Sequence, residues 1–358
     1  MNLVLSSSGA LKNRKESARI TLFLLAEELK EQGHDLRIIL NGPKCQEEIQ
    51  GFSVYRSPML GIPLLLRQLH REKKIDIVHS FSASPLFILP HLWAPGKLVH
   101  SLKSYPRSKS HRQNVFRQLG YHFLRFADAI TVPTTTFAQT LSFNNKVHVV
   151  HSPIDTRKFY PKKKEDLKKK RGYRQSKVIL YYGALSENKG VALLISVIPQ
   201  IVARYSNVQF LFLPRHGRIQ PWVDLVNEQQ IEAQVQFITK DVAIEDYVNL
   251  ADVVALPYLN LRGTDGNPSC LLEAMACGTP VVTADLPELR EIAEGGVDFV
   301  KAGDAQELVE KIVERLQHPD VLKVKKGLGQ AARFAVPKVG KEIEKIYSAV
   351  YSLQSGGQ

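Results

Sequence analysis

The stretch D-G-N-P-S-C-L-L-E-A-M-A-C-G-T-P-V-V, residues 265–282, decides the fold that we expect for this chain. Asn267 is a good helix N-cap and Pro268 a good first helical residue, so a helix is predicted to begin here. Gly278 should end the helix, Pro280 prevents its return, and the two valines that follow should begin a strand. A loop, a helix and a strand in this order are typical of an α/β domain built on a parallel sheet.

Two carboxylates flank the predicted start of this helix. Asp265 precedes the helix, and Glu273 lies inside it with a side chain that leans back toward the N-terminus. The N–H groups of Ser269 and Cys270 would lack partners within the helix, so this helix end favours an anion. An anion site between two carboxylates suits a ligand that carries phosphate and several hydroxyls, such as a nucleotide sugar.

These residues closely resemble the donor-site signature of the retaining GT-B glycosyltransferases, in particular glycosyltransferase family 4. The family pattern is E-G-x-P-x-x-x-L-E-A-M-A-x-G-x-P-V-V, and this chain departs from it at Asp265, where the family usually has Glu. The resemblance implies an α/β protein of the GT-B class, with two Rossmann-like, doubly wound parallel-sheet domains that face a central cleft. It also implies that Glu273 binds the ribose hydroxyls and that Asp265 contacts the transferred sugar.

A second loop, Y-Y-G-A-L-S-E-N-K-G at residues 181–190, resembles the family pattern G-R-L-x-x-x-K-G, in which Arg and Lys clamp the diphosphate. Lys189 matches the Lys, whereas Ala184 replaces the Arg. Lys103 follows a predicted strand and either restores the missing charge or belongs only to the basic surface. The residues predicted to act in catalysis are Lys103, Lys189 and Asp265. Those predicted to bind the donor are Gly183, Lys189, Asp265, Gly266, Asn267, Ser269, Cys270 and Glu273.

Apolar, β-branched runs alternate with helical periodicity along most of the chain, which is typical of parallel sheets covered by helices on both faces. The pattern stops at a turn-rich segment, residues 151–161, and then restarts, so two domains are predicted. Residues 1–155 are expected to form the acceptor-side domain and residues 156–334 the nucleotide-sugar (donor) domain. By resemblance, residues 335–358 form a helix that packs back on the first domain.

The individual elements are predicted from these patterns. Strands are expected at residues 3–5, 36–40, 75–78, 97–102, 129–132, 147–150, 178–182, 208–213, 235–238, 253–256, 280–283 and 298–300. Helices are expected at residues 16–32, 113–126, 134–141, 191–204, 245–250, 269–277 and 305–317. The run K-K-K-E-D-L-K-K-K-R, which begins at Lys162, predicts a further helix that is exposed and solvated.

The net charge of +13 is unevenly distributed. Between Asp76 and Asp128 there is no acidic residue, and basic residues alternate with aromatic ones. This mixture suits an anionic membrane face or an anionic acceptor, and a solvated basic helix is the alternative. Nucleic acid is an unlikely partner, since only charge suggests it. The residues predicted for the acceptor or membrane side are Lys12, Arg14, Lys15, Arg107, Lys109 and Arg112.

The sequence suggests neither a metal site nor a bound cofactor. Its three cysteines lack metal-ligand spacing and it has no D-x-D motif, so the only co-substrate expected is the nucleotide diphosphate sugar. The apolar run at the N-terminus is too short for a signal peptide, and three prolines make residues 77–96 a poor membrane span. We therefore expect a cytoplasmic protein, with peripheral attachment to a membrane as an open option.

The resemblance implies a retaining, metal-independent glycosyltransferase. It would move a hexose-type sugar from a nucleotide diphosphate sugar to a glycan or to a polyprenyl- or other lipid-linked acceptor. Two alternatives stay open. One is a nucleotide-sugar epimerase, and the other is a non-catalytic or regulatory nucleotide-sugar-binding protein, which Ala184 and Asp265 suggest because both depart from the family at donor positions.

Overall fold

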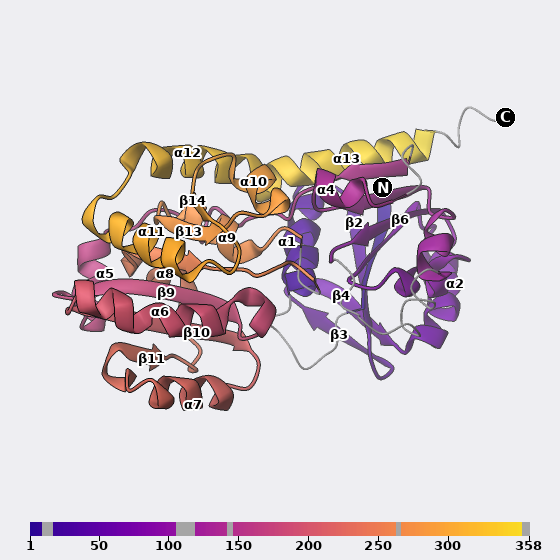
Figure 1. Ribbon diagram of the computed structural model, residues 1–358. Coiled ribbons are helices and arrows are strands. Elements are labelled where there is room, and N and C mark those ends of the chain that lie inside the picture. The colour runs from indigo at the N-terminus through magenta and orange to yellow at the C-terminus, as the bar shows by residue number, and fades with distance from the viewer. Residues whose placement is uncertain (9–16, 105–118, 142–145, 263–265, 353–358) are drawn as a thin grey trace. The chain divides into compact units, whose positions relative to one another are not determined.

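The computed structural model describes residues 1–8, 17–104, 119–141, 146–262 and 266–352. The chain divides into two compact units, each built on a parallel sheet (Figure 1). Unit 1 comprises Met1–Pro153, Arg262–Gly266 and Val336–Gln358, and unit 2 comprises Ile154–Leu261 and Asn267–Ala335. The predicted α/β class with two parallel-sheet domains is confirmed.

The sheet of unit 1 has the order β3-β4-β2-β1-β5-β6-β7-β8 in the described part of the chain. Its strands are β1 (Asn2–Ser7), β2 (Asp35–Asn41), β3 (Cys45–Ile49), β4 (Phe52–Ser57), β5 (Ile77–Ser82), β6 (Lys97–Leu102), β7 (Ala129–Val132) and β8 (Val147–Val149). β3 pairs with β4 in the antiparallel sense, and the other pairs are parallel. The sequence did not predict the β3–β4 hairpin, because β3 is a largely exposed edge strand with no apolar alternation.

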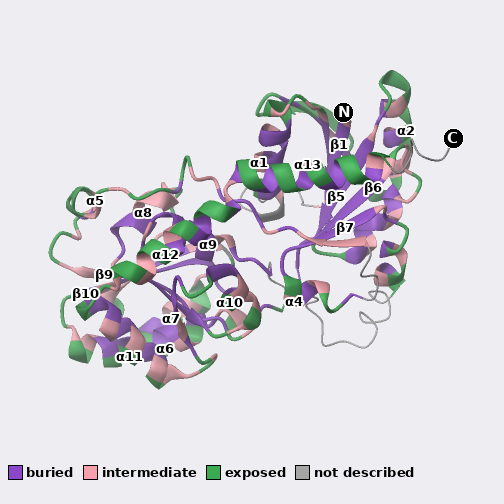
Figure 2. Cartoon of the chain, turned by 90° about the horizontal axis from the view of Figure 1, so that it is seen from above, coloured by how far each residue is buried: buried purple, intermediate pink, exposed green. Residues whose placement is uncertain are grey.

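Helices cover both faces of this sheet. They are α1 (Ser17–Glu31), α2 (Ile62–Glu72), α4 (Thr135–Ala138) and α13 (Val336–Ser352), with 3-10 helices η1 (Met59–Gly61) and η2 (Pro85–His91), and residues 119–124 are also helical. α1 and α13 lie side by side over one face (Figure 2) and share a core that includes Leu25 and Ile343. Gly340 permits their close approach, because a Cβ there would lie 2.4 Å from Cγ of Glu28. On the other face, α2 and η2 pack through Leu66 and Phe87.

Unit 2 has an entirely parallel sheet of order β11-β10-β9-β12-β13-β14 among its described residues. Its strands are β9 (Lys177–Ala184), β10 (Val208–His216), β11 (Val235–Phe237), β12 (Val253–Leu256), β13 (Val281–Ala284) and β14 (Asp298–Val300). The helices are α5 (Lys164–Arg171), α6 (Val191–Arg204), α7 (Gln220–Glu228), α8 (Ile244–Leu250), α9 (Ser269–Ala276), α10 (Pro287–Ala293), α11 (Ala305–Gln317) and α12 (Val321–Ala331), with 3-10 helices η4 (Glu187–Lys189), η5 (Glu232–Gln234) and η6 (Ala332–Phe334). α6 and α11 pack together in its main apolar core.

The basic run after the linker is more than a solvated helix. It forms α5, but Lys168 is only 5% exposed and its Nζ lies 2.5 Å from a carboxylate oxygen of Asp252. Asp252 also accepts a hydrogen bond of 2.8 Å from the backbone N–H of Val178, at the start of β9. The prediction of an exposed, solvated helix is therefore wrong at Lys168, where a buried ion pair ties α5 to the sheet.

Candidate functional site

The helix at the centre of the sequence signature is α9, and its N-cap lies one residue later than predicted. Pro268 is its N-cap, with φ −64° and ψ 119°, and the helix starts at Ser269. Pro268 is extended rather than helical, so Asn267 lies outside the cap position and is fully buried instead. The N–H groups of Ser269 and Cys270 precede the first backbone hydrogen bond of the helix, from Leu271 N–H to Pro268 C=O.

Glu273 lies in the buried part of α9 and is paired with an arginine. Nη2 of Arg215 donates to Oε2 of Glu273 at 2.5 Å, and Nη1 donates to Oγ of Ser269 at 3.1 Å. The two side chains are 12% and 8% exposed. Sequence reasoning missed Arg215, although an arginine directly after the apolar run of β10 was a signal that could have found it.

The neighbouring carboxylate keeps Arg215 charged. Burial by itself lowers the pKa of Arg215, but the Glu273 carboxylate outweighs burial and raises it, so the guanidinium stays charged. Burial raises the pKa of Tyr182 well above its usual value, and the charge of Glu273 raises it further. The site therefore combines a cation, a carboxylate and a neutral phenol.

Two tyrosines near the start of α9 each have a cationic side chain over the ring. The hydroxyl of Tyr182 donates to the C=O of Cys270 at 2.6 Å, and the hydroxyl of Tyr258 lies 3.1 Å from Sγ of the same residue. Cζ of Arg215 lies 5.7 Å from the centre of the Tyr182 ring. Nζ of Lys189 lies 5.3 Å from the centre of the Tyr258 ring. Each cation thus rests on a ring whose hydroxyl contacts Cys270.

Backbone geometry positions the loop that carries Lys189. Gly183, near the end of β9, has φ +140°, and Gly190 ends η4 with φ +72°. The backbone N–H groups of Leu259 and Asn260 both donate to the C=O of Asn188, at 2.9 and 3.3 Å. The loop is therefore fixed against the segment that follows β12.

The remaining predicted residues are divided between the units. Gly266 and Lys103 come together in unit 1, where Gly266 N–H donates to Lys103 C=O at 3.3 Å. Lys103 is 6% exposed, and its Nζ lies 6.0 Å from the centre of the Phe81 ring. Gly183, Lys189, Asn267, Ser269, Cys270 and Glu273 all belong to unit 2. Asp265, Lys12, Arg14, Lys15, Arg107, Lys109 and Arg112 lie outside the described residues.

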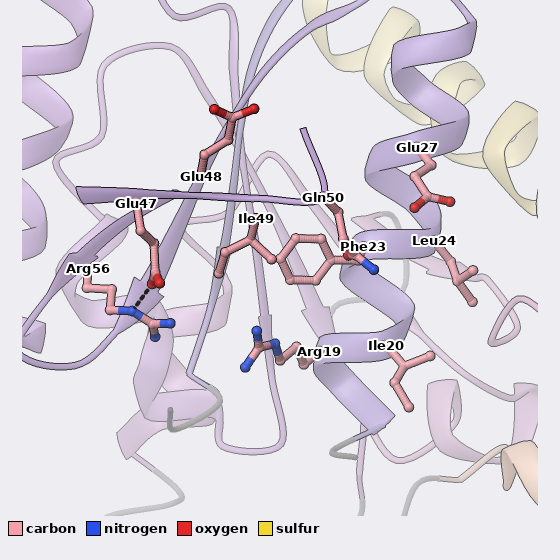
Figure 3. Close-up of a pocket in the computed structure, with 10 residues that line it drawn as sticks. All are labelled: Arg19, Ile20, Phe23, Leu24, Glu27, Glu47, Glu48, Ile49, Gln50 and Arg56. Atoms are coloured by element: carbon pink, nitrogen blue, oxygen red, sulfur yellow. Dashed lines mark hydrogen bonds and ion pairs between the residues drawn. The ribbon is translucent and has the colours of Figure 1, made fainter. Parts of the chain in front are cut away.

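A groove of about 680 Å³ lies within unit 1 (Figure 3). It runs between α1, which contributes Arg19 and Phe23, and the β3–β4 hairpin, which contributes Glu47 and Arg56. Arg56 is 4% exposed and is paired with Glu47. The sequence did not predict this groove. Its lining carries both signs of charge: it comprises Arg19, Ile20, Phe23, Leu24, Glu27, Glu47, Glu48, Ile49, Gln50 and Arg56.

His79 is buried, and both of its ring nitrogens lie within hydrogen-bond distance of side-chain hydroxyls. Its Nδ1 lies 2.6 Å from the hydroxyl of Tyr347, and its Nε2 lies 2.7 Å from Oγ of Ser101. Burial lowers the pKa of His79 well below its usual value, and the charge of Lys103 lowers it further. This neutral histidine links β5 and β6 to α13.

The described residues contain neither a membrane-spanning helix nor a cluster of metal ligands. No helix there is long and apolar enough to cross a membrane. In the same part of the chain, no three His, Cys, Asp or Glu side chains lie close enough together to hold a metal ion. The absence of a metal requirement stays a prediction.

Two protein-family models match the chain. The model described as Glycosyltransferase Family 4 matches residues 18–158, and the model described as Glycosyl transferases group 1 matches residues 176–318. The chain belongs to glycosyltransferase family 4. The second match contains Lys189, Arg215 and Glu273, and the first contains Lys103.

Individual relatives are distant. A phosphatidyl-myo-inositol mannosyltransferase of Mycobacterium leprae (strain TN) is 31% identical over 189 residues, which is 50% of this chain and 48% of that protein. The chain thus spans about half the length of this relative. N-acetyl-alpha-D-glucosaminyl L-malate synthase of Bacillus anthracis is 21% identical over 367 residues, 93% of this chain and 94% of that protein.

Solved structures agree on the fold. Sucrose-phosphate synthase from Thermosynechococcus elongatus superposes with a TM-score of 0.80 over 98% of this chain and 99% of that chain, at 17% identity. At this identity the likeness concerns the fold alone. The expected GT-B class of this family 4 chain is confirmed.

Proposed function

We propose that this family 4 chain transfers a hexose-type sugar from a nucleotide diphosphate sugar to a glycan or lipid-linked acceptor, with retention and without a metal ion. The observation that carries the proposal is the start of α9, where Lys189 and Arg215 lie near N–H groups that precede the first hydrogen bond of the helix, beside Glu273. Such a helix end suits an anion, and the buried carboxylate suits a hydroxyl donor.

The proposed reaction requires no covalent intermediate with the protein, and its main requirement is stabilisation of the leaving group. As the bond between the anomeric carbon and the diphosphate oxygen breaks, negative charge grows on the leaving diphosphate. The acceptor hydroxyl oxygen would bond to the anomeric carbon, and its proton would pass to the leaving diphosphate. Lys189 and the N–H groups of Ser269 and Cys270 would stabilise that charge, and such preorganised electrostatics are often the largest catalytic contribution. Glu273 would accept hydrogen bonds from the ribose. Lys103 stays a candidate for a further positive group and Asp265 for a contact to the transferred sugar.

The acceptor side rests on different observations. One relative is named as a mannosyltransferase of phosphatidyl-myo-inositol, which supports a lipid acceptor. In unit 1, Leu60 of η1 and Leu64 of α2 are 94% and 70% exposed, and Arg67 and Arg71 are exposed residues at helical spacing from Leu64. Apolar and basic side chains along one face suit the surface of an anionic membrane.

Vesicle binding tests the membrane contact. The chain should sediment with phosphatidylserine-containing vesicles, and the double variant Leu60→Glu/Leu64→Glu should sediment much less. The matched control is Val321→Glu/Leu322→Glu in unit 2, which adds the same charge at residues that are 74% and 81% exposed. Equal sedimentation of the two double variants would remove this part of the proposal.

A thermal-shift screen tests the donor. Uridine, guanosine and adenosine diphosphates and their sugars are added, and a ligand at 100 times its Kd should stabilise the chain by about 2.7 kcal/mol. Glu273→Gln should reduce the shift, whereas Glu310→Gln, at an exposed residue of α11, should not. If none of these ligands shifts the melting temperature of the unaltered chain, the proposed function fails.

Transfer is then measured with the donor that binds. Phosphatidylinositol, a polyprenyl phosphate and oligosaccharides serve as acceptors, the anomeric configuration of the product is read by NMR, and a chelator is added in parallel. Retained configuration and undiminished rate with chelator are expected. An inverted product or loss of activity with chelator would overturn the retaining or the metal-independent part.

The alternatives predict other products. A regulatory nucleotide-sugar-binding protein, which Ala184 still favours, would bind the donor without transfer or hydrolysis with any acceptor. A nucleotide-sugar epimerase would release an epimer or a free sugar without an acceptor. Product analysis with and without acceptor therefore distinguishes the three readings.

A further inference from the structure

Arg215 occupies an irregular position at the end of β10. β10 pairs with β9 in register, Pro214 opposite Gly183 and His216 opposite Ala184, and the register shifts between Pro214 and His216. Arg215 is thus the extra residue of a bulge. A bulge redirects the side chain of its extra residue and is often found beside functional sites.

The bulge brings the guanidinium to the first turn of α9. Its Nη1 lies 3.1 Å from Oγ of Ser269, the first residue of that helix, and its Nη2 lies 2.5 Å from Oε2 of Glu273. These contacts engage two of the nitrogen atoms. Among the described residues, the buried Nε finds no hydrogen-bond partner. An arginine has five N–H donors, so the group retains donor capacity for an anion.

A second cation is linked to the start of the same helix through a tyrosine. Lys189 rests on the ring of Tyr258 as Arg215 rests on the ring of Tyr182, and both hydroxyls contact Cys270. The Glu273 carboxylate offsets one of these two positive charges, and the partial positive charge of the helix end adds to the other. The site therefore favours a ligand with more than one negative charge.

Arg215 also lies next to the position that lacks a charge. Ala184 ends β9, and its partner on β10 is the residue directly after Arg215. The side chains of residues 184 and 215 therefore begin at neighbouring positions on the same edge of the sheet. We propose that Arg215 is the second diphosphate-binding cation of unit 2, and that it provides from β10 the positive charge that Ala184 does not provide from β9.

This inference rests on the proposed function, since it assigns a residue to the same donor site. In it, Ser269 and Glu273 position the guanidinium, and Lys189 faces the diphosphate from the other loop. A purely structural ion pair is the competing explanation. That explanation predicts that loss of Arg215 changes the Kd of a nucleoside monophosphate and of a nucleoside diphosphate by the same factor.

Charge relocation tests the inference. Four variants are compared with the unaltered chain: Arg215→Ala, Ala184→Arg/Arg215→Ala, Glu273→Gln, and Arg215→Ala/Glu273→Gln, which leaves no unpaired carboxylate. Calorimetry measures the Kd for inorganic pyrophosphate, and for the nucleoside diphosphate and monophosphate of the base preferred in the donor screen. Circular dichroism confirms that each variant is folded.

Arg215→Ala should weaken pyrophosphate and diphosphate binding roughly ten- to hundredfold, and monophosphate binding much less. Ala184→Arg/Arg215→Ala should recover most of the loss, because the charge returns from the neighbouring strand. If Arg215→Ala does not fold, the Glu273→Gln background supplies the same comparison against Glu273→Gln alone.

Two results would overturn the inference while the proposed function stands. One is unchanged diphosphate binding without Arg215, and the other is an equal loss for monophosphate and diphosphate. If the unaltered chain binds no nucleotide, the proposed function and the inference fail together.

Discussion

Gly190 is the residue at which a single methyl group should do most damage to the donor site. Its φ of +72° is left-handed, which costs an L-residue about 1–2 kcal/mol. A Cβ there would also lie 1.8 Å from the carbonyl oxygen of Pro257, so the two segments must move apart. Overpacking of this kind costs about 1–3 kcal/mol, and Gly190→Ala should therefore lower the free energy of unfolding by about 2–5 kcal/mol.

The displacement should also be felt in binding. Lys189 directly precedes Gly190, and Tyr258, whose ring carries the Lys189 ammonium, directly follows Pro257. A shift that separates these segments moves the ammonium from the start of α9. Gly190→Ala should therefore reduce the nucleotide-induced thermal shift at temperatures where the variant is still folded.

Gly172 offers a matched control in the same unit. It has φ +83°, but nothing lies within 4 Å of the Cβ that an alanine would add. Gly172→Ala should cost only the backbone contribution of about 1–2 kcal/mol and leave nucleotide binding intact. Urea denaturation and thermal shift measure both variants. Equal destabilisation by the two substitutions, or an intact nucleotide response in Gly190→Ala, would refute the reasoning.

Three further outcomes follow from buried polar groups. Burial lowers the pKa of His91 to about 4, so the unfolded chain binds a proton below pH 6.5 that the folded chain does not. The free energy of unfolding should therefore fall as pH drops from 6.5 toward 4, and this group should account for a fall of about 2 kcal/mol at pH 5. Urea denaturation of His91→Gln should show a smaller dependence of the free energy of unfolding on pH. An unchanged pH dependence in this variant would contradict the argument. Tyr347→Phe removes the hydroxyl that contacts Nδ1 of buried His79 and should cost about 1–3 kcal/mol, with hydrogen exchange rising first in α13; unaltered exchange there would contradict it. Asp252→Ala leaves the buried Lys168 ammonium unpaired and should cost about 3–5 kcal/mol in urea denaturation, whereas Asp285→Ala at an exposed pair should cost about 0–1 kcal/mol; similar values would contradict the burial argument.

The sequence predicts the centre of each sheet well, because central parallel strands are buried on both faces and consist of continuous apolar residues. The inner strands β6, β7 and β12 have the predicted bounds, as do the edge strand β14 and the helices α6 and α11, whereas the inner strand β5 lies at Ile77–Ser82 instead of the predicted 75–78. The predictions fail where burial does not determine the residue types. β3 at the edge of the sheet has mostly exposed side chains, and α2 leaves leucines on its outer face. Periodicity carries little information in β3, whereas the buried Ile62, Leu66 and Leu69 of α2 recur at helical spacing and were a signal that could have predicted this helix.

The donor site also contains some residues that the sequence predicts and one that it does not. Glu273 and the start of α9 are local features of one continuous stretch, so spacing and capping rules place them to within one residue. Arg215 cannot be found in this way. Its approach to Ser269 and Glu273 depends on the pairing of β10 with β9 and on a bulge, and the residues involved are more than fifty positions apart in the chain. Register between strands is a tertiary property that no short sequence window contains.

This difference bears on how Ala184 should be interpreted. Taken as a departure from a sequence pattern, it suggests a weakened donor site and favours a regulatory protein. In the structure, Ala184 and Arg215 lie at the ends of adjacent parallel strands, where side chains from either strand start near the same helix end. An anion responds to where a positive charge lies and not to which strand carries it. The absence of an arginine at position 184 is therefore weak support for inactivity as long as Arg215 contacts the first turn of α9, and the charge-relocation variants decide between the two interpretations.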